Sequence, residues 1–202
     1  MIWWIALPLD STILETLQRL RTAALASDDP EPNAMNIATA DPGGRVHSRM
    51  VLLKTLDERG LTFFTDYEGD KGRQLADNPH VALCLHWKRL DPAVQVRIEG
   101  RVEKLPQAES DAYFATRARL SQLGAWASLQ SQTLPDRATL EQRVAEVDRR
   151  FTGHPVPRPA KWGGYLVVPD MVEFWYAHEH RLNERHRWEL VDGEWRERLL
   201  YP

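Results

Sequence analysis

The segment EFWYAHEHRLNERHRW, residues 173–188, concentrates side chains that could do chemistry. It holds three histidines, three arginines and two tryptophans in sixteen positions. Imidazoles can bind a metal, guanidinium groups can bind the phosphates of a nucleic acid, and guanidinium with indole can hold a small anionic ring. The rest of the chain must decide among these three chemistries.

Metal binding has little support. His178 and His180 are two residues apart and would share one face of a strand, but no third ligand is marked and Arg181 adjoins them, which opposes a bound cation. We interpret the histidines as surface residues and expect no metal. Nucleic acid is also an unexpected partner, because the net charge is -3 and the basic and acidic residues are interleaved without a basic face.

A phosphate site is suggested by the segment that follows Pro106. Tyr113, Arg117 and Ser121 are spaced at i, i+4 and i+8, so a continuous helix over 106–120 and beyond would stack them on one stripe. Guanidinium and hydroxyl groups are good phosphate donors, although a solvated helix face remains an alternative. The uncharged polar residues that come next could recognise the edge of a planar heterocycle; they are Gln122, Gln130, Ser131 and Gln132.

Two further cations bracket an apolar run in SRMVLLK. Arg49 and Lys54 are an odd number of residues apart, so on a strand they point to opposite faces. One could reach a phosphate while the other reaches a different ligand or the solvent. A simple role as strand-end cations is equally compatible with this spacing.

The elements that must position these residues are mostly short strands. A helix is predicted over about 12–25, with Thr12 and Glu15 in capping-box positions. Short β-type runs then fill 34–105, separated by turns, with one short helical stretch at GDKGRQLADN. Turns this short favour antiparallel neighbours.

The second half of the chain predicts helices and then strands again. RATLEQRVAEVDRRF reads as a helix, and GYLVVPDMVEFWY and HRWELVDGEWRERLLY read as strands, the latter with a type I′ hairpin signal at Asp192-Gly193. We therefore predict a β-rich α+β fold, an antiparallel barrel with peripheral helices. Residues 1–30 would form an N-terminal arm and helix, and residues 31–202 a single domain.

Cellular location is indicated by cysteine use and by the apolar start of the chain. Cys84 is the single cysteine, so no disulfide framework forms within one chain, which is typical of a reducing compartment. MIWWIAL is too short for a membrane span and lacks the basic region of a signal peptide. We expect a soluble, cytoplasmic protein without a membrane partner.

Ordered motifs along the chain resemble those of the pyridoxamine/pyridoxine 5′-phosphate oxidases. The resemblance covers roughly 31–202, and its motifs are EPNAMNIATAD, RMVLLK, FFTDYEGDKGRQLADNP, VQVRIEGRVEKL, YFATRARLSQLGAWASLQSQ, VPRPAKWGGY and EFWYAHEHRLNERHRW. It implies an FMN-binding split barrel that works as a homodimer with the flavin at the interface. It also implies oxidation of pyridoxamine or pyridoxine 5′-phosphate by O2 to pyridoxal 5′-phosphate, with release of hydrogen peroxide and, from the amine, ammonia.

Position by position, the resemblance implies roles for individual residues. The implied FMN contacts are Arg49, Met50, Val51, Leu52, Leu53, Lys54, Phe64, Thr65, Lys71, Gln95, Gln130, Ser131, Trp175 and Arg185. The implied substrate contacts, chiefly to its phosphate, are Lys54, Tyr113, Arg117 and Ser121. Arg181 and Asn183 would be catalytic and cover the substrate ring beside the flavin.

Three positions depart from the family pattern. Asn183 stands where the family usually has histidine, Asp70 where it often has a cation, and Phe64 where it usually has tyrosine. Two other functions stay open: a split-barrel flavin oxidase of another substrate, such as a dihydrophenazine precursor, and a non-catalytic protein that binds FMN or pyridoxal phosphate. The predicted phosphate stripe disfavours a substrate that lacks phosphate.

Overall fold

The computed structural model describes residues 7–202, so the apolar start MIWWIAL lies outside the described residues except for Leu7. Within the described part, the helices are α1 (Ser11–Leu25), α2 (Asp70–Asp77), α3 (Gln107–Ala115), α4 (Arg119–Ala127), α5 (Arg137–Arg150) and the short 3-10 helix η1 (Glu179–Arg181). The strands are β1 (Ala34–Ala40), β2 (Val46–Leu52), β3 (Leu56–Asp57), β4 (Gly60–Asp66), β5 (His80–Trp87), β6 (Val94–Lys104), β7 (Trp162–Tyr176), β8 (Glu184–Val191) and β9 (Glu194–Leu199).

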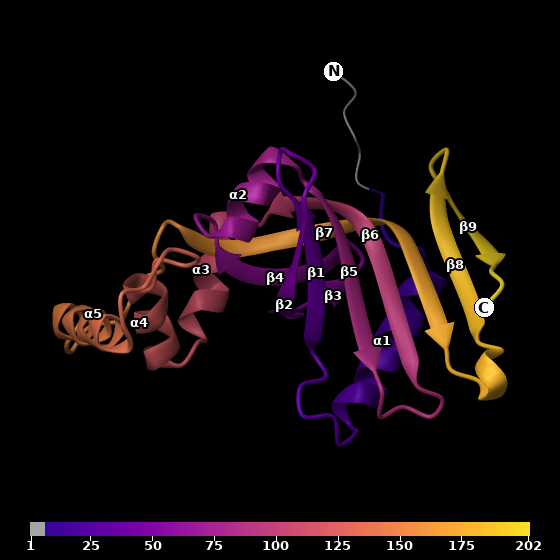
Figure 1. The fold of residues 1–202 in the computed structure, drawn as a ribbon, viewed down its shortest axis with the longest axis horizontal. Helices are drawn as coiled ribbons and strands as arrows, with labels where there is room; N and C mark the ends of the chain where they lie inside the picture. Colours follow the sequence, from indigo (N-terminus) through magenta and orange to yellow (C-terminus); the bar gives the residue numbers. More distant parts are fainter. Residues whose placement is uncertain (1–6) are drawn as a thin grey trace.

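The strands form one antiparallel sheet that curls without closing (Figure 1). Its order is β2-β1-β5-β6-β7-β4-β3, and β8 and β9 extend it from β7. The segment that follows β2 lies against β4, and the Lys54 N–H donates to the Thr62 carbonyl at 2.9 Å. The predicted antiparallel split barrel with peripheral helices is confirmed.

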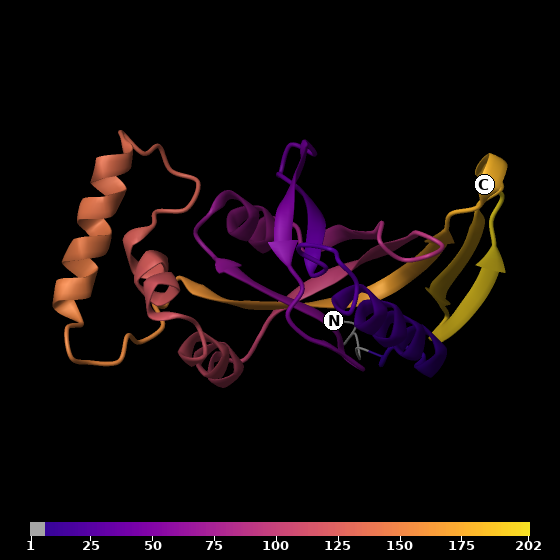
Figure 2. The ribbon, with the colours of Figure 1, turned by 90° about the horizontal axis from the view of Figure 1, so that it is seen from below.

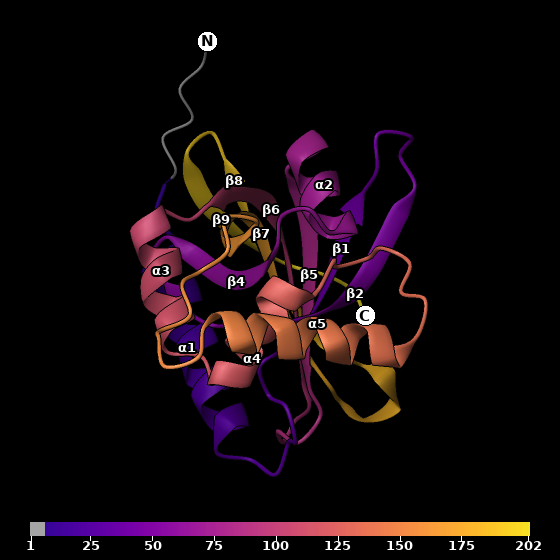
Figure 3. The same ribbon diagram turned by 90° about the vertical axis from the view of Figure 1, so that its left-hand side faces the viewer.

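The long strand β7 connects the barrel to the C-terminal hairpin. One of its edges pairs with β6, while the other pairs first with β4, over Trp162–Val167, and then with β8, over Met171–Tyr176. As a result, α4 and α5 lie at one end of the molecule and the β8–β9 hairpin at the other (Figures 1 and 2). Figure 3 shows α4 and α5 in front of the barrel end of the sheet.

The main core lies inside the curled sheet and under α1. Alternate residues of the strands point inward, as in β5, where Leu83 and Leu85 are buried while their neighbours are more exposed. Helix α1 adds Ile13, Leu17 and Leu20 to the same hydrophobic cluster. Helix α1 therefore belongs to the main core, and burying each of these side chains stabilises the fold by about 1.5–3 kcal/mol.

A second, smaller core attaches the helical end to the sheet. It contains Phe114 of α3 and Leu123 of α4, together with Trp162, the first residue of β7, and Val156, which precedes that strand. This packing sets the position of the loops on both sides of α4, which carry several of the predicted site residues.

The predicted continuous helix after Pro106 is wrong. Helix α3 ends at Ala115, Ala118 is extended with φ -54° and ψ 139°, and α4 begins at Arg119. The hydroxyl of Thr116 donates to the Tyr113 carbonyl at 2.8 Å, a local bond that competes with continuation of the helix. Tyr113, Arg117 and Ser121 therefore do not form one helical stripe.

Two local predictions had different outcomes. The capping residue of α1 is Asp10, whose side chain accepts from the Thr12 N–H at 2.8 Å, so the predicted capping box at Thr12 and Glu15 is wrong. The hairpin signal at Asp192-Gly193 is confirmed, because both residues have positive φ, 52° and 83°, as a type I′ turn between β8 and β9 requires.

Candidate active site

Four of the predicted FMN contacts come together where β4, α2 and the loop after α4 meet; we call Thr65, Lys71, Gln130 and Ser131 the Lys71 cluster. The ammonium of Lys71 donates to Gln130 Oε1 at 2.6 Å and to Thr65 Oγ1 at 3.0 Å. Ser131 Oγ accepts from the N–H of Asp70 at 3.1 Å, at the first residue of α2. Ser131 has φ 71°, a backbone conformation that costs about 1–3 kcal/mol in a residue other than glycine and is often found at functional sites.

Arg49 adds a second cation to this region. Its guanidinium donates to Thr39 Oγ1 at 2.6 Å and to Gln74 Oε1 at 3.0 Å, and both acceptor residues are buried. Burial, and then the charge of Arg49, lower the pKa of Lys71. Two partly buried cations that destabilise each other fit a bound anion such as the phosphate of FMN.

Asp70, which departs from the family pattern, has an ion-pair partner that the sequence reasoning missed. Asp70 pairs with Arg73 one turn later on α2, with 2.6 Å between Oδ1 and Nη2, and both side chains are more than half exposed. Residues three apart on a helix are neighbours, which is the signal that could have identified Arg73.

A second group, the Arg117 cluster, consists of Lys54, Phe64, Tyr113, Arg117 and Trp162. The ring of Phe64 stacks on that of Tyr113, with 4.0 Å between centroids, and lies 5.3 Å from that of Trp162. The guanidinium carbon of Arg117 is 4.6 Å from the Trp162 ring centroid, and Lys54 Nζ is 5.9 Å from the Tyr113 ring centroid.

Arg117 Nη1 supplies a direct test of whether this group fits a phosphate. This nitrogen is buried and has no hydrogen-bond partner among residues 7–202. Burial lowers the pKa of Arg117, and a bound anion would favour its charged form. A buried donor without an acceptor is costly, and a phosphate oxygen would satisfy it. Ser121 is exposed on the first turn of α4 and does not belong to this stack.

Arg49 lies beside the Lys71 cluster, whereas Lys54 belongs to the Arg117 cluster. Because β2 ends at Leu52, Lys54 lies beyond the strand that the spacing argument assumed. Between the two cations, Leu53 is buried, whereas Met50 and Leu52 are exposed on the outer face of β2. The side chain of Leu53 is therefore closed to a ligand, and Val51 is intermediate in exposure.

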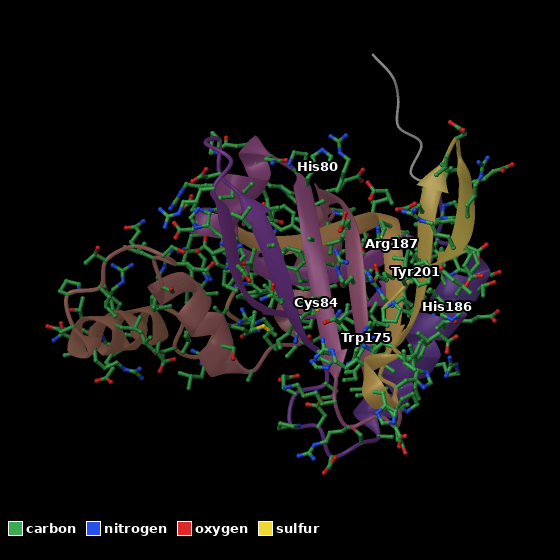
Figure 4. The ribbon with its side chains drawn as sticks, turned by 45° about the vertical axis from the view of Figure 1, so that its right-hand side comes forward. His80, Cys84, Trp175, His186, Arg187 and Tyr201 are labelled. Atoms are coloured by element: carbon green, nitrogen blue, oxygen red, sulfur yellow. The ribbon has the colours of Figure 1, made fainter. Side chains whose placement is uncertain are left out.

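The remaining predicted residues lie at the hairpin end of the sheet. Gln95, Trp175 and Arg185 are direct cross-strand neighbours on β6, β7 and β8. Figure 4 shows Trp175 and Tyr201 where β7 meets the hairpin, and Arg185 Nη1 donates to the Tyr201 carbonyl at 3.0 Å. We call Gln95, Trp175, Arg181, Asn183 and Arg185 the hairpin group.

The two predicted catalytic residues lie in the turn before β8. Arg181 is exposed and has φ 61°, directly after His180 with φ 55°. Asn183 Oδ1 accepts from the His178 N–H at 3.1 Å, so its amide holds the turn closed. Among residues 7–202, no three His, Cys, Asp or Glu side chains are arranged to hold a metal.

One chain does not bring the hairpin group to the Lys71 and Arg117 clusters. Helix α4, beside both clusters, and the β8–β9 hairpin occupy opposite ends of the molecule (Figure 2). A cavity of about 1070 Å³ beside β6, β7 and the hairpin is lined by none of the predicted site residues. A site that used both the clusters and the hairpin group would have to combine two chains.

The outer face of the sheet carries exposed apolar side chains. Six residues align across neighbouring strands on this face: Met50, Asn36, Cys84, Arg97, Glu173 and Arg187. Met50 is 57% exposed, and Leu52 on the same face of β2 is 38% exposed, so part of this surface is apolar and uncovered in a single chain.

Comparisons with known proteins identify the family of this chain. Residues 11–151 match the family model "Pyridoxamine 5'-phosphate oxidase", and residues 162–202 match "Pyridoxine 5'-phosphate oxidase C-terminal dimerisation region". A pyridoxine/pyridoxamine 5′-phosphate oxidase of Myxococcus xanthus is 54% identical over 172 residues, which cover 85% of this chain and 82% of the relative. One of Xanthomonas euvesicatoria is 48% identical over 191 residues, covering 94% and 96%.

Solved structures share the fold. The structure of PhzG from Burkholderia lata in complex with tetrahydrophenazine-1-carboxylic acid has a TM-score of 0.89 and 30% identity, and covers 100% of this chain and 98% of that one. An FMN-binding protein of Nostoc punctiforme has a TM-score of 0.70 at 18% identity, covering 100% and 99%, which shows the fold alone.

The fold defines a split-barrel protein. Within that class, the chain belongs to the pyridoxine/pyridoxamine 5′-phosphate oxidase family. It is a homodimeric oxidoreductase that uses FMN as its cofactor. In residues 7–202, no helix is long and apolar enough to cross a membrane.

We expect the affinity for FMN to fall as the pH rises, and to begin falling at a lower pH than it would if Lys71 had the pKa of an ordinary lysine. Phosphate binding favours the protonated ammonium of Lys71, whose pKa is lowered, so the charge is lost as the pH rises through that lowered value. Lys71→Arg should retain its affinity to higher pH, because a guanidinium stays protonated. Fluorescence titrations with FMN between about pH 7 and about pH 10 measure both proteins; parallel pH profiles would contradict this role of Lys71.

Proposed function

We propose that the protein oxidises pyridoxine 5′-phosphate and pyridoxamine 5′-phosphate to pyridoxal 5′-phosphate. Molecular oxygen would accept the electrons and leave as hydrogen peroxide, and the amine substrate would also release ammonia. The observation that carries the proposal is the buried, unsatisfied Nη1 of Arg117 beside Tyr113 and Lys54, which suits a phosphorylated substrate. The names of the relatives point to the same substrates.

Different groups of residues would bind the phosphate of FMN and the phosphate of the substrate. The Lys71 cluster and Arg49 would hold the phosphate of FMN, and Lys54, Tyr113 and Arg117 would hold that of the substrate. Bound FMN supplies the redox chemistry, accepting a hydride and returning electrons to oxygen. The hairpin group of the partner chain would complete the site, with Arg181 and Asn183 over the substrate ring.

Anaerobic rapid mixing tests the proposal. The holoenzyme is mixed with pyridoxine 5′-phosphate under nitrogen, and the flavin absorbance band is followed. We expect fast bleaching with the phosphorylated substrate and slow or no bleaching with unphosphorylated pyridoxine, which cannot use Arg117. A flavin that stays oxidised with both phosphorylated substrates would contradict the proposal.

The structural similarity to PhzG supports a second candidate, oxidation of a reduced phenazine precursor. The identity is only 30%, against about half for the phosphate oxidases, and the Arg117 cluster has no evident use for a substrate without phosphate. A non-catalytic FMN or pyridoxal phosphate carrier is the third candidate. In the mixing experiment, the phenazine oxidase would bleach only with a dihydrophenazine, and the carrier with neither substrate.

Arg117→Ala should raise KM for both phosphorylated substrates and leave the FMN content unchanged. A charge-assisted hydrogen bond to phosphate contributes about 1.5–3 kcal/mol, which corresponds to roughly 10- to 100-fold in KM. Steady-state kinetics and flavin absorbance measure the two quantities. Arg137→Ala is the matched control, because it removes an exposed arginine of α5 whose partner is Glu141. Unaltered kinetics in Arg117→Ala would place the substrate phosphate elsewhere.

The location of the protein is also a proposal. We infer a cytoplasmic protein, since the single cysteine, Cys84, leaves no disulfide within one chain to require an oxidising compartment.

A further inference from the structure

Glu173 is a buried carboxylate on the outer face of β7, at the hairpin end of the sheet. Its side chain is only 2% exposed, and its direct cross-strand neighbours are Arg97 on β6 and Arg187 on β8. Oε2 accepts from Arg187 Nε at 2.9 Å and Nη2 at 2.7 Å, and from Arg97 Nη1 at 3.4 Å. The other oxygen, Oε1, accepts from Arg185 Nε at 2.9 Å and Nη2 at 2.8 Å.

These contacts fix the direction of the Arg185 guanidinium. Glu173 holds its Nε and Nη2, and the Tyr201 carbonyl holds its Nη1 at 3.0 Å, so all three nitrogens are anchored. Arg185 is also the direct cross-strand neighbour of Trp175. Arg185, which we propose faces the flavin, is therefore held in one orientation before any ligand binds. This lowers the entropic cost of binding.

Glu173 stays charged in this environment. Burial alone would raise its pKa, but hydrogen bonds from Arg187 and Arg185 outweigh burial, and the pKa of Glu173 lies below its ordinary value. The flanking arginines have further partners, since Arg97 pairs with Glu99 at 3.1 Å and Arg187 with Glu189 at 3.5 Å. Arg185, in contrast, makes its one ion pair among residues 7–202 with Glu173.

We propose that Glu173 is a positioning residue for the flavin site, which orients Arg185 towards FMN and is itself held by Arg187. This rests on the proposed role of Arg185 in binding FMN. The two carboxylate oxygens of Glu173 bind different arginines: Oε2 accepts from Arg187, and Oε1 accepts from Arg185. Glu173 itself need not touch the flavin.

Glu173→Gln tests the proposal at nearly constant side-chain volume. An amide has one acceptor oxygen instead of two, so it cannot satisfy both arginines, and its NH2 group must face a guanidinium. We expect the dissociation constant of FMN, measured by flavin fluorescence on the full-length dimer, to rise roughly 10- to 100-fold. Glu99→Gln is the matched control, since it breaks an ion pair on the same face without contacting Arg185, and it should bind FMN like the wild type.

A second variant separates positioning from a general loss of structure. In Glu173→Gln/Arg187→Met the competing guanidinium is absent, so the amide oxygen can turn to Arg185, and FMN affinity should return to within several-fold of Arg187→Met alone. Size-exclusion chromatography and thermal unfolding monitor the dimer throughout. A double variant no better than Glu173→Gln overturns the proposal, as does wild-type affinity in Glu173→Gln.

Arg185→Ala distinguishes failure of this inference from failure of the assigned site. If Arg185→Ala loses FMN while Glu173→Gln does not, the flavin role of Arg185 holds and the positioning role of Glu173 is wrong. If Arg185→Ala binds FMN like the wild type, the assigned flavin role of Arg185 is wrong, and the inference about Glu173 fails with it.

Discussion

A mixed dimer with Arg117→Ala in one chain and Arg181→Ala in the other should recover about half of the wild-type turnover, because one of the two sites in a two-fold dimer is then intact. Each variant as a homodimer should lose most of its activity at low substrate concentration. Arg117 lies between α3 and α4, and Arg181 lies just before β8. Because α4 and the β8–β9 hairpin occupy opposite ends of the molecule (Figures 1 and 2), a site that uses both residues must take them from different chains. Recovery in the mixed dimer would be direct evidence for that composition.

The experiment requires two affinity tags, so that only the mixed dimer is purified, and a steady-state assay with pyridoxine 5′-phosphate. The matched control is a mixed dimer of Arg117→Ala and Lys54→Ala. These two residues belong to the same cluster of the same chain, so each site of that dimer carries one defect and no recovery is expected. Equal activity in the two mixed dimers would contradict a site shared between chains.

Arg181→Ala and Arg185→Ala should fail in different ways, although they are four residues apart. Arg181→Ala should retain FMN but reduce it on the order of 100-fold more slowly, because loss of the substrate's near-attack position has an effect of this size. The side chain is exposed in the turn before β8 and is free to meet a substrate in the partner's site. Arg185→Ala should lose FMN first, and excess FMN should partly restore its activity.

Rapid-mixing absorbance under nitrogen, at saturating FMN, measures both variants. Asn183→His is a useful companion, since an imidazole adds a donor in nearly the same space and should be tolerated or raise kcat modestly. If Arg181→Ala reduces its flavin at the wild-type rate, hydride transfer depends on other groups and the catalytic role of Arg181 is wrong.

Local order was predictable from the sequence because it depends on near neighbours. The alternation of apolar residues identifies strands such as β5 and β6, and Asp192-Gly193 identifies the last hairpin. The ordered motifs also identified the family, and hence the split barrel and its cofactor. Where several local signals compete, as at Thr116 between α3 and α4, the same reasoning failed. The Thr116 hydroxyl donates to the Tyr113 carbonyl there, a bond that competes with continuation of the helix.

The convergence of side chains was decided by the tertiary structure alone. Lys71 meets Gln130 across 59 positions, and Arg185 is oriented by Glu173, which the sequence reasoning did not single out. Neither contact has a periodicity or turn signal, because each depends on how β7 divides one edge between β4 and β8. The sequence by itself determined the chemical groups and the local elements. Long-range strand pairing decided which groups face each other, and it left the two predicted binding clusters and the hairpin group at opposite ends of one chain.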